Sequence, residues 1–207
     1  DPDNENLVEQ VSTKKITVSE VSKKAKNIVL IDCGAKKNIE RALTKRGVNV
    51  ITVPWNFDLT TSEYKDKVDG VVISNGPGNP KYVLETIENI KKLFNLNLPI
   101  LGVCLGNQLL CLAAGGDTDK LKYGHRSQNQ PCTMAGTKRC FITTQNHGFE
   151  VSKIPNDFKT WFTNANDGSN EGIIHKTRPI MSVQFHPEAT PGPEDTEWIF
   201  DYFLKKI

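Results

Sequence analysis

The sequence Pro99-Ile100-Leu101-Gly102-Val103-Cys104-Leu105-Gly106-Asn107-Gln108-Leu109-Leu110 joins an apolar run, typical of a buried strand, directly to a helical pattern. Cys104 stands at the junction. The start of a helix presents unpaired backbone N–H groups and the positive end of the helix dipole, and both favour a thiolate. The flanking glycines let backbone approach whatever the sulfur attacks. The pattern predicts a nucleophile elbow with cysteine in place of serine, although a cysteine after a strand is also often a core residue.

Working outward, apolar runs and helical patterns alternate along the first half of the chain. Strands are predicted at 27–32, 48–53 and 70–74, and helices at about 37–46 and 81–94. Because the runs are apolar throughout, they predict an α/β fold with a mostly parallel sheet and helices on both faces. Ligands of such sheets bind at the carboxyl ends of the strands. The turn at 75–80 and the Cys104 elbow both lie at that edge, so we expect them side by side.

From about residue 118 the pattern changes to shorter segments separated by turn residues. Segments such as 139–144 and 180–185, with the tight-turn sequence Asn166-Asp167-Gly168-Ser169, predict a smaller antiparallel part made of hairpins beside the parallel sheet. A last helix is expected at about 194–205. Residues 1–26 are polar and Lys-rich and are interpreted as a linker or the tail of a preceding small domain, which leaves 27–207 as the main domain.

The bulk properties exclude several function classes. A net charge of +2 over 207 residues gives no electrostatic reason to expect nucleic acid or a membrane as partner. No apolar run approaches the roughly 20 residues that span a bilayer. The five cysteines include no Cys-x-x-Cys pair, which argues against disulfides and against a metal site and favours a reducing, cytoplasmic compartment. They are Cys33, Cys104, Cys111, Cys132 and Cys140.

A base for Cys104 is offered by the segment Gln184-Phe185-His186-Pro187-Glu188. The residue before a proline favours an extended conformation, in which residues two apart point to the same side. Glu188 can then reach the imidazole of His186 and orient it, as the third member of a catalytic triad does. Taken alone the segment could be a surface turn. With the elbow it predicts a triad of Cys104, His186 and Glu188.

These motifs resemble the class I glutamine amidotransferases, which have a flavodoxin-like α/β fold. The resemblance rests on the Cys104 elbow and on His186-Pro187-Glu188. Segments 74–80, 118–131 and 145–149 are similar to the carbamoyl phosphate synthetase members of that family. The opening, with Asp1-Pro2-Asp3, Asn6-Leu7-Val8 and Val11-Ser12, resembles the join after their small amino-terminal domain. Segment 166–172 is most similar to the glutaminase part of the multifunctional eukaryotic pyrimidine-pathway protein.

The resemblance implies a role for each matching residue. Cys104 would attack the side-chain amide of L-glutamine and form a γ-glutamyl thioester, while His186 moves the protons and Glu188 orients it. An oxyanion hole would come from the N–H of Leu105 and from a glycine of the turn Gly76-Pro77-Gly78. The positions that match those holding the substrate are Gln108, Asn146, Gly148 and Phe149.

The resemblance also implies a partner. Ammonia would pass to a carbamoyl phosphate synthetase domain or subunit, which alone would use ATP, bicarbonate and metal, so no cofactor is expected in this domain. The glycine turn lacks the Gly-Lys-Ser/Thr ending of a P-loop. Two alternatives stay open: a weakly active glutamine-binding or regulatory module that depends on its synthetase, and a free-standing γ-glutamyl or peptide hydrolase.

The chain departs from the family pattern at Asn107, Asn79 and the segment 126–128, where the family more often has histidine, aspartate and a glycine-containing sequence. None is a triad position, so we expect altered surroundings and not lost catalysis. His125 and His175 are expected to be structural or solvent-facing. His147 lies within the substrate motif, where it either contacts substrate or only shapes the loop.

Overall fold

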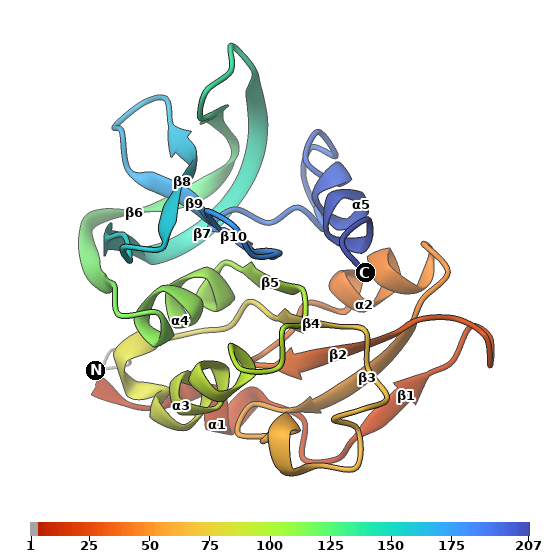
Figure 1. The fold of residues 1–207 in the computed structure, drawn as a ribbon. Coiled ribbons are helices and arrows are strands. Elements are labelled where there is room, and N and C mark those ends of the chain that lie inside the picture. The colour runs from red at the N-terminus through yellow and green to blue at the C-terminus, as the bar shows by residue number, and fades with distance from the viewer. Residues whose placement is uncertain (1–3) are drawn as a thin grey trace.

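The computed structural model describes residues 4–207, and in this part of the chain the strands form one sheet (Figure 1). The strands lie in the order β1-β3-β2-β4-β5-β10-β9-β8-β6-β7. Their bounds are β1 Thr17–Ser19, β2 Asn27–Asp32, β3 Asn49–Pro54, β4 Gly70–Ile73, β5 Ile100–Val103, β6 Asp117–Met134, β7 Cys140–Lys153, β8 Phe158–Asn164, β9 Asn170–His175 and β10 Ile180–Val183. The α-helices are α1 Leu7–Val11, α2 Lys37–Thr44, α3 Leu84–Leu93, α4 Leu105–Ala113 and α5 Trp198–Leu204, with 3-10 turns η2 Leu59–Thr61 and η3 Pro80–Tyr82.

The parallel half of the sheet confirms the α/β prediction. Strands β3, β2, β4, β5 and β10 run parallel, and every residue of β4, β5 and β10 is buried. Helices α1, α3 and α4 cover one face with side chains such as Ile90 and Leu109, while α2 and α5 cover the other with Leu43 and Phe203 (Figure 1). Burial on both faces explains why these strands are apolar without alternation.

The antiparallel half differs from the expectation in two ways. The 180–185 segment was expected among the hairpins, but its strand β10 runs parallel to β5, with Ile180 opposite Ile100. The remaining strands continue the same sheet beyond β10 and do not pack beside it, because β9 pairs antiparallel with β10. Strands β6 and β7 form a long hairpin with several register shifts, and Figure 1 shows it bending away from the parallel strands. Such bulges increase local bend and twist.

The segment before residue 27 packs on the domain. Strand β1 pairs antiparallel with β3, and Val8 of α1 is fully buried. The Trp55 backbone N–H donates to the Ser12 hydroxyl over 3.0 Å, which ties α1 to the end of β3. Val8 is the buried apolar side chain among the described residues 4–26, and the backbone hydrogen bonds between β1 and β3 add a second attachment. Residues 1–3 of the predicted linker, which carry part of the resemblance, lie outside the described residues. The interpretation of 1–26 as the tail of a preceding domain stays a prediction.

Two helices begin later than the sequence pattern predicts. The helix expected at 81–94 starts as the 3-10 turn η3 and becomes α3 at Leu84, and the helix expected at 194–205 starts at Trp198. Asn79 caps η3 by accepting a hydrogen bond from the Lys81 N–H over 3.0 Å, so the amide does the capping expected of an aspartate. None of the described helices is long and apolar enough to cross a membrane.

Candidate active site

Cys104 forms the nucleophile elbow that the sequence predicts. It lies between β5 and α4 with φ +53° and ψ −103°, a conformation that non-glycine residues rarely adopt. Its N–H donates to the Val183 carbonyl over 2.8 Å, and its carbonyl accepts from the Asn107 N–H over 3.0 Å. These bonds hold a strained backbone that costs about 1–3 kcal/mol. Such strain at the carboxyl edge of a parallel sheet is typical of a functional residue.

The glycine turn lies beside the elbow, as expected, because β4 pairs directly with β5. A Cβ on Gly76 would lie 2.1 Å from the Cys33 carbonyl oxygen and 2.7 Å from the Leu105 side chain. Only glycine allows this approach. Gly78 has φ +85°, in the left-handed region. The turn is therefore pressed against the first residue of α4, where main-chain N–H groups are unpaired within the helix.

His186 and Glu188 make the predicted contact, with 2.7 Å between Nδ1 and Oε1. The prediction that this segment is extended is wrong. The Ala189 N–H donates to the His186 carbonyl over 3.2 Å, so Pro187 and Glu188 occupy a turn and not an extended segment. Proline suits the first inner position of such a turn because its φ is fixed near −65°. A chain reversal thus folds the carboxylate back onto the ring.

Charge stabilises the protonated form of His186. Burial lowers the pKa of this histidine, but the neighbouring Cys104 sulfur and the Glu188 carboxylate together raise it to about 10. Burial also raises the pKa of Glu188, yet the hydrogen bond and charge of His186, with the charge of Lys36, hold it below its ordinary value. The Lys36 ammonium lies 3.3 Å from Glu188 Oε1 and donates to the Ala189 carbonyl over 2.8 Å. His186 and Glu188 therefore form a buried imidazolium–carboxylate pair.

Sequence reasoning missed Lys36 and Gln184. Lys36 follows β2 at the same edge of the sheet as the elbow, and that position was the available signal. The Gln184 amide Nε2 lies 3.7 Å from Cys104 Sγ, and its Oε1 accepts from Asn107 over 3.0 Å and from Gln108 over 3.1 Å. Asn107, which departs from the family pattern, thus orients a side chain that faces the sulfur.

One cavity of about 1000 Å³ brings the predicted site together. Its lining includes Gly76, Gly78, Cys104, Leu105, Gln108, Asn146, Gly148, Phe149 and His186. Glu188 is not in the lining and lies fully buried behind His186. Three cationic side chains also border the cavity, Lys36, Lys120 and Arg126. The cavity thus combines a thiol, an imidazolium and positive charge, which suits an amide substrate that carries a carboxylate.

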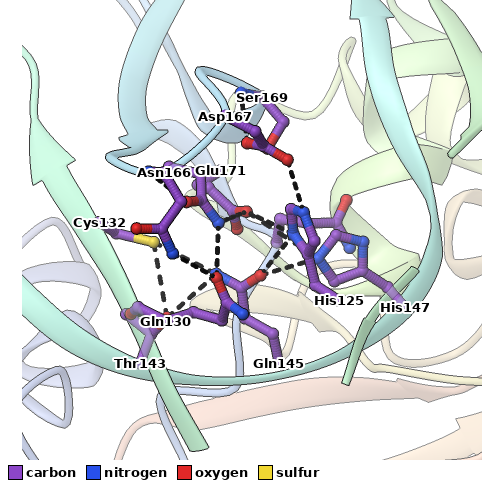
Figure 2. Close-up of polar contacts among 12 residues, drawn as sticks. His125, Gln130, Cys132, Thr143, Gln145, His147, Asn166, Asp167, Ser169 and Glu171 are labelled. Atoms are coloured by element: carbon purple, nitrogen blue, oxygen red, sulfur yellow. Dashed lines mark hydrogen bonds and ion pairs between the residues drawn. The ribbon is translucent and has the colours of Figure 1, made fainter. Parts of the chain in front are cut away.

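The wall opposite the elbow comes from β7. The Phe149 carbonyl accepts from Gln108 Nε2 over 2.9 Å and lies 2.9 Å from His147 Nδ1. His147 is therefore buried and shapes the wall. His175 accepts from the Arg178 N–H over 2.9 Å, a structural role. His125 is buried beside acidic groups, and within the described residues His125, His147 and Glu171 are close enough to hold a metal ion (Figure 2).

Comparison with known proteins places this geometry in a family. The family described as glutamine amidotransferase class-I matches residues 29–206, a range that includes the elbow and the His186–Glu188 pair. A carbamoyl phosphate synthase arginine-specific small chain of Neurospora crassa is 48% identical over 210 residues, covering 100% of this chain and 46% of its own length. A multifunctional protein CAD of Squalus acanthias is 49% identical over 209 residues, covering 99% of this chain and 9% of its own length. The chain spans about half the length of the small chains that it matches.

Solved structures agree on the fold. A putative GMP synthase component of Thermoplasma acidophilum superposes with a TM-score of 0.77 at 28% identity, covering 89% of this chain and 94% of that one. A glutamine amidotransferase of Thermotoga maritima superposes with a TM-score of 0.66 at 17% identity, covering 87% and 83%, and supports the fold alone. With its cysteine elbow, its His–Glu pair and the family match over nearly its whole length, this chain belongs to the class I glutamine amidotransferases.

Proposed function

We propose that this chain hydrolyses L-glutamine to glutamate and ammonia, and that the ammonia passes to a carbamoyl phosphate synthetase domain or subunit in pyrimidine or arginine biosynthesis. The observation that carries the proposal is the Cys104 thiol on a strained elbow, in one cavity with an imidazolium that a buried carboxylate orients. The names of relatives that are 48–49% identical over the chain support the synthetase partner.

The reaction uses the proton that His186 holds. The Cys104 sulfur attacks the side-chain amide carbon of glutamine. As the C–N bond breaks, His186 gives its proton to the departing nitrogen, which leaves as ammonia, and a γ-glutamyl thioester remains. His186 then removes a proton from water, whose oxygen attacks the thioester and releases glutamate. Glu188 keeps its charge throughout and stabilises each imidazolium that forms.

The oxyanion of each tetrahedral intermediate would be held by the N–H of Leu105 and by a glycine N–H of the 76–78 turn. Losing one such donor typically costs about 10²–10³ in rate. We propose that Gln108, Asn146, Gly148 and Phe149 hold glutamine, because all of them border the cavity that also holds the Cys104 thiol. The bordering cations favour its carboxylate.

This chemistry needs no cofactor at the triad, so ATP, bicarbonate and the metal of the synthetase reaction are assigned to the synthetase partner, and a small domain is expected to precede the 1–26 segment in the assembly. A cytoplasmic location is proposed because all five cysteines are free, four of them buried.

The test measures glutamate release from glutamine by this chain, alone and with a carbamoyl phosphate synthetase partner, beside Cys104→Ala and Cys104→Ser. The proposal expects release that both substitutions abolish. Release only with the partner would favour the dependent module. Faster turnover of γ-glutamyl peptides than of glutamine would favour the free-standing hydrolase, and no release under either condition would overturn the enzyme assignment.

A further inference from the structure

A buried polar cluster lies behind the β7 wall of the cavity. Along β7, Gln145 and His147 are buried while Asn146 between them is exposed, so the strand presents the two buried side chains away from solvent. They meet His125 from β6 and Glu171 from β9 (Figure 2). We propose that this cluster binds one divalent transition-metal ion of the zinc class through His125 Nδ1, His147 Nε2 and a Glu171 oxygen, with Gln145 Oε1 as a fourth ligand.

The spacing of the ligand atoms suits such an ion. The atoms of His125, His147 and Glu171 all lie within 4.8 Å of one another. Glu171 Oε1 is 3.2 Å from His125 Nδ1 and 3.9 Å from His147 Nε2. Gln145 Oε1 is 2.8 Å from the first of these nitrogens and 3.1 Å from the second. Zinc bonds of about 2.0–2.2 Å place tetrahedral ligand atoms about 3.3–3.6 Å apart, so small shifts would admit the ion.

Outer partners fix the orientation of each ligand. His125 Nε2 lies 2.8 Å from the Asp167 carboxylate, and His147 Nδ1 lies 2.9 Å from the Phe149 carbonyl. Metal-binding histidines almost always donate their second ring N–H to a carboxylate or a carbonyl. The Gln145 amide donates to the Thr143 hydroxyl over 3.0 Å, which turns its oxygen toward the histidines. The proposed ligand atoms thus lie around one point.

Hydrogen bonding within the cluster is incomplete without a cation. His147 Nδ1 lies 2.9 Å from the Phe149 carbonyl, which can only accept, so Nδ1 carries the ring proton. In the neutral ring Nε2 then has a lone pair, which lies 3.1 Å from the Gln145 Oε1 oxygen. Glu171 is fully buried, and its Oε2 has no hydrogen-bond partner. A metal ion bound by His147 Nε2, Gln145 Oε1 and the Glu171 carboxylate would give the facing lone pairs a shared partner.

Binding would displace one proton. Both ring nitrogens of His125 face acceptor oxygens, Nδ1 at 2.8 Å from Gln145 Oε1 and Nε2 at 2.8 Å from Asp167 Oδ2. The metal ion takes the place of the proton on Nδ1, which leaves to solvent, and the Glu171 and Asp167 carboxylates balance the charge of the ion. The cluster lies next to solvent, because the Asp167 side chain beside His125 is 46% exposed and Gln145 and His147 border the cavity.

A bound metal ion would also make the part of β7 that borders the cavity more rigid. Gln145 and His147 border the cavity on the same strand as Asn146. This consequence rests on the proposed glutaminase function, and it predicts that metal loading changes KM for glutamine more than kcat.

The primary test measures metal binding and not glutamine turnover. Chelator-stripped Cys104→Ala chain, in which the catalytic thiol cannot compete, is titrated with Zn²⁺ and with Co²⁺. We expect one ion per chain, about one proton released near pH 7, and Co²⁺ absorption bands without a thiolate charge-transfer band. His125→Asn and Glu171→Gln should abolish stoichiometric binding. Asp167→Asn changes a partly exposed side chain and leaves the core intact. It should weaken metal binding about 10–100-fold.

The matched control is His175→Asn, which removes a histidine outside the cluster and should leave binding unchanged. Circular dichroism checks that each variant is folded. The proposal is overturned if the folded chain binds no stoichiometric ion, or if Asp167→Asn and His125→Asn bind as the parent does. Because this readout needs no glutamine turnover, its failure is distinct from failure of the proposed function.

Discussion

Replacing Glu188 with glutamine removes a charge and keeps the shape of the triad. The amide can still place an oxygen near His186 Nδ1, where the carboxylate oxygen lies at 2.7 Å. What is lost is the negative charge, which helps to hold the pKa of His186 at about 10 against burial. The Lys36 ammonium, now 3.3 Å from the carboxylate, would add its unopposed positive charge. Both changes disfavour the imidazolium.

The expected size follows from the charge alone. A neighbouring opposite charge shifts a pKa by about 1–3 units, and each unit is about 1.4 kcal/mol. The pKa of His186 should therefore fall by that amount in Glu188→Gln. Because the first half of the reaction uses the imidazolium and the second half forms it again, kcat/KM for glutamine should fall about 10–10³-fold, one factor of ten for each 1.4 kcal/mol.

Stability should depend on pH with a defined sign. The folded pKa of His186, about 10, lies above its ordinary value of 6.5, so its contribution to the free energy of unfolding is complete below pH 6.5 and is lost between pH 6.5 and 10. The pKa of Glu188 is lowered, so its contribution is present above its ordinary value of 4.5 and is lost as the pH falls below it. Glu188→Gln should flatten both trends.

The assays are glutamate release against pH, NMR titration of the His186 ring, and urea unfolding at pH 6 and pH 10. Glu194→Gln, which neutralises an exposed carboxylate on the following loop, serves as the matched control. A His186 pKa within about 0.3 units of the parent, or kcat/KM within about twofold, would refute the charge argument.

Three further substitutions test the surroundings of the elbow. Gln184→Leu removes the amide that lies 3.7 Å from Cys104 Sγ and should lower kcat/KM about tenfold, the worth of one hydrogen bond to a charged group; unchanged kinetics and unchanged alkylation of the thiol would contradict this. Gly76→Ala puts a Cβ 2.1 Å from the Cys33 carbonyl and should cost about 1–3 kcal/mol in urea unfolding and slow glutamate release; parental stability would count against the close approach. Phe185→Ala leaves a cavity at a fully buried aromatic position and should lower the free energy of unfolding by about 3–5 kcal/mol, measured by thermal unfolding. A loss below about 1 kcal/mol would contradict a core role for Phe185.

Sequence reasoning worked where neighbours in the chain set the geometry. The Cys104 elbow follows from a strand running directly into a helix, and the doubly buried strands are visible as continuous apolar runs. Sequence reasoning did not identify the sheet neighbour of the 180–183 strand. Nothing in the run 180–183 marks β5 as its parallel partner, because an apolar segment buried on both faces reads the same wherever it lies in the sheet. The β6–β7 hairpin was only partly visible, because the 139–144 segment predicts part of β7 while polar side chains dominate the rest of both strands.

The sequence by itself determined the α/β class, the elbow, the glycine turn and the pairing of His186 with Glu188, although not the turn that makes this contact, since each depends on residues a few positions apart. Tertiary structure alone decided that Lys36 and Gln184 face the triad, and that His125, His147 and Glu171 converge behind the substrate wall. The physical reason is that these groups come from strands and turns far apart in the chain. Only the pairing of those strands fixes which side chains share a buried point and must therefore balance one another's charges and hydrogen bonds.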